Sequence, residues 1–143
     1  MRVPTTLTIL SLLVLFCGCL GMSDTMDSIE MASETGDPSK CENVSESFQF
    51  LCYMAAAVES ENVSVCEKIQ GNASLMGCYM AVAVNTDNVS ICEMIEHEEF
   101  EYACYTGVAS ETQNITVCDK IRNEQIRHEC IEKVEKDKGQ QLA

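Results

Sequence analysis

The chain has 143 residues and a formal net charge of −14. This length suits one small domain or a short repeat array. Residues 20–117 contain 17 acidic and two basic side chains, whereas residues 118–143 contain six of each. A surface this acidic repels nucleic acid and anionic lipid, which argues against a role in binding either.

The N-terminal residues predict export from the cytoplasm. Residues 7–16 are an apolar run of signal-peptide length. Gly18-Cys19 follows, and this pair resembles the lipobox of secreted lipoproteins, in which the Cys is lipidated and becomes the new N-terminus. We therefore expect a signal peptide over residues 1–18 and a lipid anchor on Cys19. An uncleaved anchor over residues 3–22 and plain secretion are the alternatives, and all three place the remainder outside the cytoplasm.

The next segment, residues 19–36, is rich in Ser, Thr, Asp, Glu and Met. We predict an acidic flexible tether here. The seventeen residues after Cys19, residues 20–36, would have a root-mean-square span of roughly 23 Å as a flexible chain, which would lift the following domain off a membrane surface.

A repeat of 26 residues governs the rest of the chain. The cysteines after the signal region alternate in steps of 12 and 14, apart from a first step of 11, and stand at positions 41, 52, 66, 78, 92, 104, 118 and 130. A fixed period of this kind is the signature of a stacked repeat protein. We predict a repeat domain over residues 37–138, with units beginning near residues 37, 62, 88 and 114, followed by a tail over residues 139–143.

Each unit predicts a short helix that carries the first Cys. In the unit Asn62-Val63-Ser64-Val65-Cys66-Glu67, the pair Ser64 and Glu67 forms a capping-box pattern. Asn62, two residues earlier, is a rival N-cap, and the other units offer the same choice. The sequence leaves both alternatives open. An apolar residue three positions after each first Cys shares its helix face; these residues are Val44, Ile69, Ile95 and Ile121.

The second Cys of each unit lies in a second, longer helix. Tyr53, Tyr79 and Tyr105 each follow that Cys directly, and apolar residues recur at helical spacing. Positions three and five after the Cys are small in the first three units, which would let a neighbouring helix approach. A single hairpin cannot bury its apolar face alone, but stacked hairpins can. We therefore predict an all-α fold: a short right-handed α-solenoid of about four αα-hairpin repeats.

The eight repeat cysteines predict four disulfides. Eight cysteines allow 105 pairings, but only a within-unit scheme is regular and leaves no Cys without a partner. Two antiparallel helices about 9 Å apart also place the two cysteines of a unit within disulfide range. The expected bridges are Cys41–Cys52, Cys66–Cys78, Cys92–Cys104 and Cys118–Cys130.

Few residues indicate chemistry. Glycosylation sequons stand at Asn43, Asn62, Asn72, Asn88 and Asn114. The recurring Tyr53, Tyr79 and Tyr105 form a candidate binding ladder, although core packing is the favoured explanation for them. His97 lies in an acidic run at a predicted turn, where a solvated role is the simpler reading. No catalytic set, cofactor motif or metal-ligand spacing stands out, so we predict no enzyme, no cofactor and no metal site.

The unit pattern, (D/N)-x-S-x-C-E-x-I followed by C-Y-x-x-[AV]-A, resembles cysteine-rich helical-hairpin repeat proteins found among predicted archaeal lipoproteins. The likeness spans residues 37–138 and implies fold and location, but no catalytic residue. We predict an extracytoplasmic, lipid-anchored binding or scaffold module on the outer face of the cytoplasmic membrane, with a protein or glycan partner. Metal handling through thiols or the acidic surface is the alternative.

Overall fold

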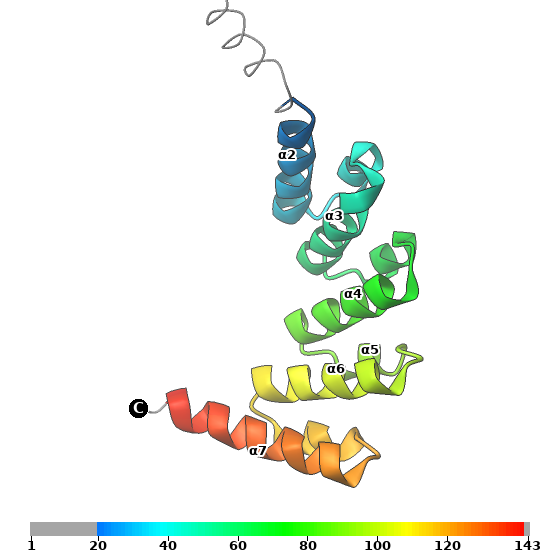
Figure 1. Cartoon of the computed structure of the whole chain (residues 1–143). Helices are drawn as coiled ribbons and strands as arrows, with labels where there is room; N and C mark the ends of the chain where they lie inside the picture. The colour runs from blue at the N-terminus through cyan, green and yellow to red at the C-terminus, as the bar shows by residue number, and fades with distance from the viewer. Residues whose placement is uncertain (1–19, 142–143) are drawn as a thin grey trace, which may run out of the picture.

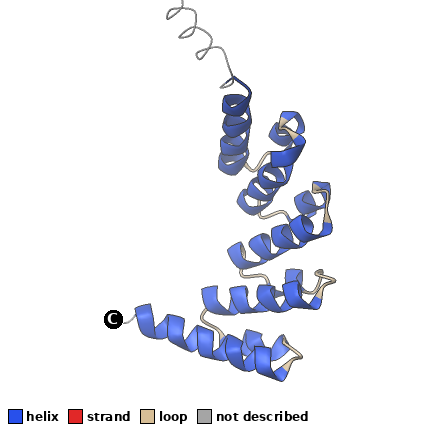
Figure 2. Ribbon diagram, in the orientation of Figure 1, coloured by secondary structure: helices blue, strands red, loops and turns tan. Residues whose placement is uncertain are grey.

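The computed structural model describes residues 20–141, and all of their secondary structure is helical. Figure 1 shows the helices stacked one on another, and Figure 2 shows short loops joining them. The predicted all-α fold of stacked hairpins is confirmed. The elements are α2 (Leu20–Thr35), η1 (Pro38–Asn43), α3 (Glu46–Glu59), η2 (Val63–Lys68), α4 (Asn72–Asn85), α5 (Val89–Cys92), α6 (Glu98–Glu111), η3 (Ile115–Lys120) and α7 (Glu124–Gln141).

The expected flexible tether is wrong, because residues 20–35 form helix α2, which packs on α3. Ala32 of α2 is fully buried, and Ile29 packs against the same core. These two residues are three apart, so they lie on one helix face and give α2 an apolar stripe. The predicted tail is also wrong in part, since α7 continues to Gln141.

Each repeat pairs a short helix with a long one, and a disulfide joins the two. The short helices η1, η2 and η3 are six-residue 3-10 helices, and α5 has only four residues. The bridges are the four predicted within-unit pairs, with Cα–Cα distances between 5.5 and 5.9 Å: Cys41–Cys52, Cys66–Cys78, Cys92–Cys104 and Cys118–Cys130. The side chains of all eight bridged cysteines are buried in the core.

The choice between rival N-caps is now resolved in favour of the earlier residue. The Asn62 side-chain oxygen accepts a hydrogen bond of 3.1 Å from the backbone N–H of Ser64. Asp37, Asn88 and Asn114 make the same contact in the other units. Ser64 therefore donates its N–H inside the first turn and does not itself cap the helix.

The same Asn residues also end the preceding long helix. The N–H of Asn62 donates to the carbonyl of Ala57 at 3.0 Å, while Glu61 between them adopts a left-handed backbone with φ 52°. This is the Schellman arrangement, which satisfies the last free carbonyls of a helix. Asp87 and Gln113 occupy the equivalent left-handed positions after α4 and α6. One Asn thus closes one helix and opens the next.

The core runs as a narrow band between the short and long helices. Besides the cystines it contains the predicted apolar positions of the short helices, all of them buried: Val44, Ile69, Ile95 and Ile121. Small residues let the long helices approach each other. A Cβ atom added at Gly107 of α6 would lie 2.9 Å from Cγ2 of Val84 on α4, so these two helices meet where a side chain is missing.

The left-handed turns give a test of this architecture. We expect Glu61→Gly to raise the free energy of unfolding by about 0.5–1 kcal/mol, because glycine adopts this backbone without strain. Glu59→Gly is the matched control: the same substitution in the last turn of α3 should lower stability by about 1 kcal/mol. Denaturant unfolding measures both. Destabilisation by both substitutions would contradict the strained turn.

Candidate binding channel

An apolar channel crosses the face formed by the long helices. It consists of two adjoining hollows of about 650 and 870 Å³ that share Met54, Val58 and Ala81. We call their joint surface the channel. Its apolar lining comes from four helices and comprises Met26 and Ile29 of α2, Phe48, Leu51, Met54, Ala55 and Val58 of α3, Gly77, Met80, Ala81 and Val84 of α4, and Gly107 of α6.

The channel residues follow the repeat but lose their apolar character along the stack. Met54 and Met80 occupy equivalent positions 26 residues apart, and the next equivalents are Thr106 and Glu132. At another equivalent position Ala55 and Ala81 give way to Gly107 and then to Lys133 of α7. The Lys133 Nζ donates to Ser110 Oγ at 3.1 Å and to Asp137 at 2.9 Å. The channel therefore lies on α2, α3, α4 and the edge of α6, and the neighbouring hollow between α6 and α7, which shares Gly107 with it, also contains Glu99 and Lys133.

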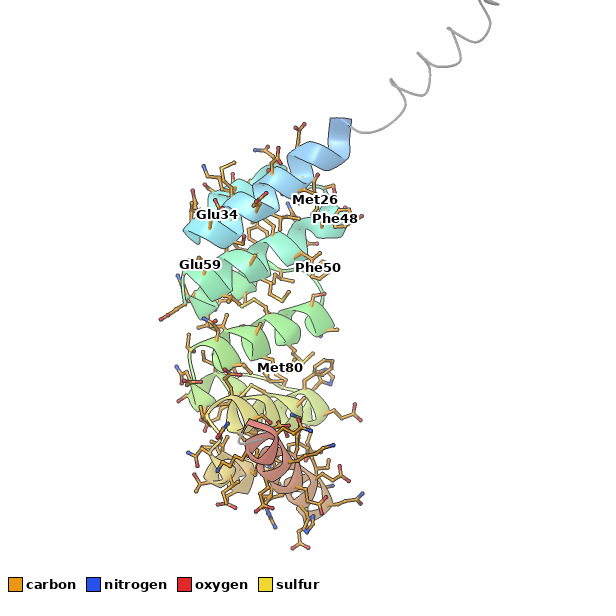
Figure 3. The ribbon with its side chains drawn as sticks, turned by 90° about the vertical axis from the view of Figure 1, so that its left-hand side faces the viewer. Met26, Glu34, Phe48, Phe50, Glu59 and Met80 are labelled. Atoms are coloured by element: carbon orange, nitrogen blue, oxygen red, sulfur yellow. A yellow bond between two sulfur atoms is a disulfide. The ribbon has the colours of Figure 1, made fainter. Side chains whose placement is uncertain are left out.

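One edge of the channel is acidic. Glu59, Asp87 and Glu111 line it near the C-terminal ends of α3, α4 and α6. Figure 3 shows Glu34 and Glu59 at the left of this face, and Met26 and Phe48 at its right. Met80 lies on the part of the face that α4 contributes. The channel therefore has one acidic and one apolar edge.

Within residues 20–141, none of these edge carboxylates pairs with a basic side chain. The last turns of α2, α3, α4 and α6 also contain no basic residue. Helix C-termini carry roughly half a negative charge each. The acidic edge, defined by Glu34, Glu59, Asp87 and Glu111, thus combines free carboxylates with helix ends that no cation compensates.

The predicted tyrosine ladder lies in the core and away from the channel. Tyr53, Tyr79 and Tyr105 are all buried, with at most 9 % of their surface exposed. Burial and the neighbouring Glu101 and Glu93 carboxylates raise the pKa of Tyr105 to about 12. Burial is also the main cause of the raised pKa of Tyr79. These rings contribute chiefly to packing.

The sequons lie on the surface. Asn43, Asn62, Asn72, Asn88 and Asn114 are all exposed. In Asn62, Asn88 and Asn114 the side-chain oxygen caps the short helix, and the side-chain nitrogen has no hydrogen bond of its own. Capping and glycan attachment therefore use different atoms of the same residue.

The remaining predicted positions add no site. His97 is exposed at the start of α6. Residues 20–141 contain no cluster of three His, Cys, Asp or Glu side chains able to hold a metal ion, and their eight cysteines are all oxidised. None of the described helices has the length and continuous apolarity needed to cross a bilayer. Cys19 and the signal region lie outside the described residues.

The channel was not predicted from the sequence. The small residues three and five positions after the second Cys were expected to serve one role, the close approach of helices. The structure separates them: Ala57, Ala83 and Ala109 are fully buried, whereas Ala55 and Ala81 line the channel. The recurrence of Met54 as Met80 was the available signal, but periodicity alone does not show which apolar face a neighbour covers.

The raised pKa of Tyr105 predicts a loss of stability at alkaline pH. A phenol that ionises at about 12 when folded, and near 10 when unfolded, stabilises the fold below pH about 10 and loses this contribution as pH rises towards 12. Between pH about 8 and pH about 11, the free energy of unfolding of the parent protein should fall by roughly 1 kcal/mol more than that of the Tyr105→Phe variant. Denaturant unfolding at both pH values measures the difference. Equal losses in the two proteins would contradict this assignment.

Comparison with protein-family models, with curated protein sequences and with solved structures found no match to this chain. Its function must therefore be inferred from its own residues.

Proposed function

We propose that this protein is a non-catalytic, extracytoplasmic binding module that holds a segment of a partner protein in the channel. The observation that carries the proposal is the continuous apolar surface shared by α2, α3 and α4, with Met54, Val58 and Ala81 common to both hollows. Open apolar grooves on soluble proteins mark interaction sites. Methionine side chains, as at Met54 and Met80, adapt readily to the shape of a partner.

The location rests on redox chemistry and on the N-terminal sequence. Structural disulfides persist in oxidising compartments, so four bridges in a small helical domain indicate an extracytoplasmic environment. Gly18-Cys19 supports a lipid anchor on Cys19, and α2 would then begin directly after the lipidated residue. The resemblance to cysteine-rich repeat lipoproteins supports the same location.

Glycosylation of the turn sequons is part of this proposal. Asn62, Asn88 and Asn114 are exposed at equivalent turns, and their side-chain nitrogens remain available after the oxygens have capped the short helices. Glycans at these turns would be repeated along the stack once per unit.

Photocrosslinking in the native host tests the binding role. A photoreactive residue at Met80, in the channel, should yield a discrete crosslinked protein. The matched control is the same residue at Met94, an exposed methionine outside the channel, which should yield none. Sensitivity of the adduct to protease identifies the partner as protein. Equal crosslinking from both positions, or none from Met80, would contradict the proposed site.

The intact mass of protein from its native membrane tests the location. We expect loss of residues 1–18, a lipid-sized increment on Cys19, and a gain of about 8 Da when the four bridges are reduced. Sugar increments at Asn62, Asn88 and Asn114 should disappear on enzymatic deglycosylation. An unprocessed N-terminus would rule out the lipid anchor, and an unmodified mature chain would indicate secretion.

A further inference from the structure

The channel favours an occupant that satisfies its own backbone hydrogen bonds. Its two neutral polar side chains are already engaged: Ser33 donates to the carbonyl of Glu30 and Asn85 to that of Val58. The rest of its floor is apolar. An extended segment would leave N–H and C=O groups without partners there, at a cost in free energy. A helix bonds these groups internally and so presents only side chains to the channel.

The dimensions and the floor of the channel suit such a helix. The channel crosses α2, α3, α4 and the edge of α6, and helices packed 8–10 Å apart make this a path of about 27 Å. About 18 helical residues have the same length. Ala55 and Ala81 line the channel with small side chains, which lets a partner helix approach closely.

The acidic edge favours a positively charged partner. Glu59, Asp87 and Glu111 line the channel and lack basic partners in the described part of the chain. Free carboxylates beside helix C-termini attract cations.

We infer that the channel binds a basic amphipathic helix of another protein, with its apolar face in the channel and its Lys or Arg residues along the acidic edge. This inference rests on the proposed binding role and specifies its partner. A second copy of the chain is disfavoured as the occupant, since residues 20–143 carry 23 acidic and eight basic side chains and two copies would repel each other. An anionic membrane surface is disfavoured for the same reason.

Two synthetic peptides test the charge requirement. Both are fluorescent helices of about 18 residues with the same leucine face, and one carries lysine where the other carries glutamate along one flank. Anisotropy titration with the full, oxidised chain at low ionic strength measures their affinities. We expect the lysine peptide to bind at least about tenfold more tightly, and the difference to shrink as salt is added.

Matched variants locate the effect. Glu59→Gln, Asp87→Asn and Glu111→Gln together should weaken binding of the lysine peptide about tenfold, since each removes an attractive charge. The control removes as many exposed carboxylates from the short-helix side, through Glu42→Gln, Glu67→Gln and Asp119→Asn, and should change binding by less than about twofold. Equal affinity of the two peptides, or equal effects of the two triple variants, would overturn the inference.

Ala81→Glu separates this inference from the proposed function. Ala81 lines both hollows, so a carboxylate there should abolish binding of either peptide while the helical circular dichroism is unchanged. If Ala81→Glu blocks binding but charge on the peptide has no effect, the channel binds and only the inferred partner chemistry fails. If Ala81→Glu changes nothing and Met80 yields no crosslink, both proposals fail. A dimer in sedimentation experiments that Ala81→Glu dissociates would instead identify a second copy as the occupant and overturn the inference.

Discussion

The fold depends on the disulfide that ties each short helix to the long helix after it. Helices of four to six residues are far below the length at which helices persist alone. A bridge such as Cys66–Cys78 closes a small loop and contributes roughly 3 kcal/mol in the chain-entropy model. Both of its cysteines are fully buried. Without this link the short helix would detach, and the core between short and long helices would open to water.

The second constraint is the turn that connects one unit to the next. Asn62 donates its backbone N–H to Ala57 and accepts from Ser64, so the chain reverses between two helices with no spare residues. This tight turn requires a residue with a left-handed backbone just before the Asn. Glycine would adopt that conformation with the least strain, but the chain has Glu61 and Asp87 at these positions. The carboxylate of Asp87 then stands at the channel. Asp87 is therefore both a left-handed turn residue and one of the carboxylates of the acidic edge.

The cysteine spacing was sufficient to predict the hairpins and their pairings, because a disulfide requires two residues that face each other. The sequence left two candidate N-cap residues in each unit. Only the structure shows that the Asn62 side chain accepts a hydrogen bond from the backbone N–H of Ser64. Helix α2 was missed because residues 20–36 lie outside the repeat and their many Ser, Thr, Asp and Glu side chains suggested a tether, although Met22, Met26 and Ile29 stand at helical spacing. The channel was missed because the sequence does not show which apolar side chains another helix covers. Met54 and Met80 could equally have been core residues.

The placement of basic residues bears on what the channel can attract. Lys120 reaches Glu93 at 2.8 Å, and Arg122 reaches Glu101 at 3.1 Å, while Lys133 pairs with Asp137 within α7. Exposed ion pairs of this kind add little to stability. Their effect is to neutralise carboxylates at the α7 end of the stack and to leave those of the acidic edge free. The carboxylates of Glu59, Asp87 and Glu111 lie beside the apolar hollows, so a basic partner would meet negative charge next to the surface where its apolar face can be buried.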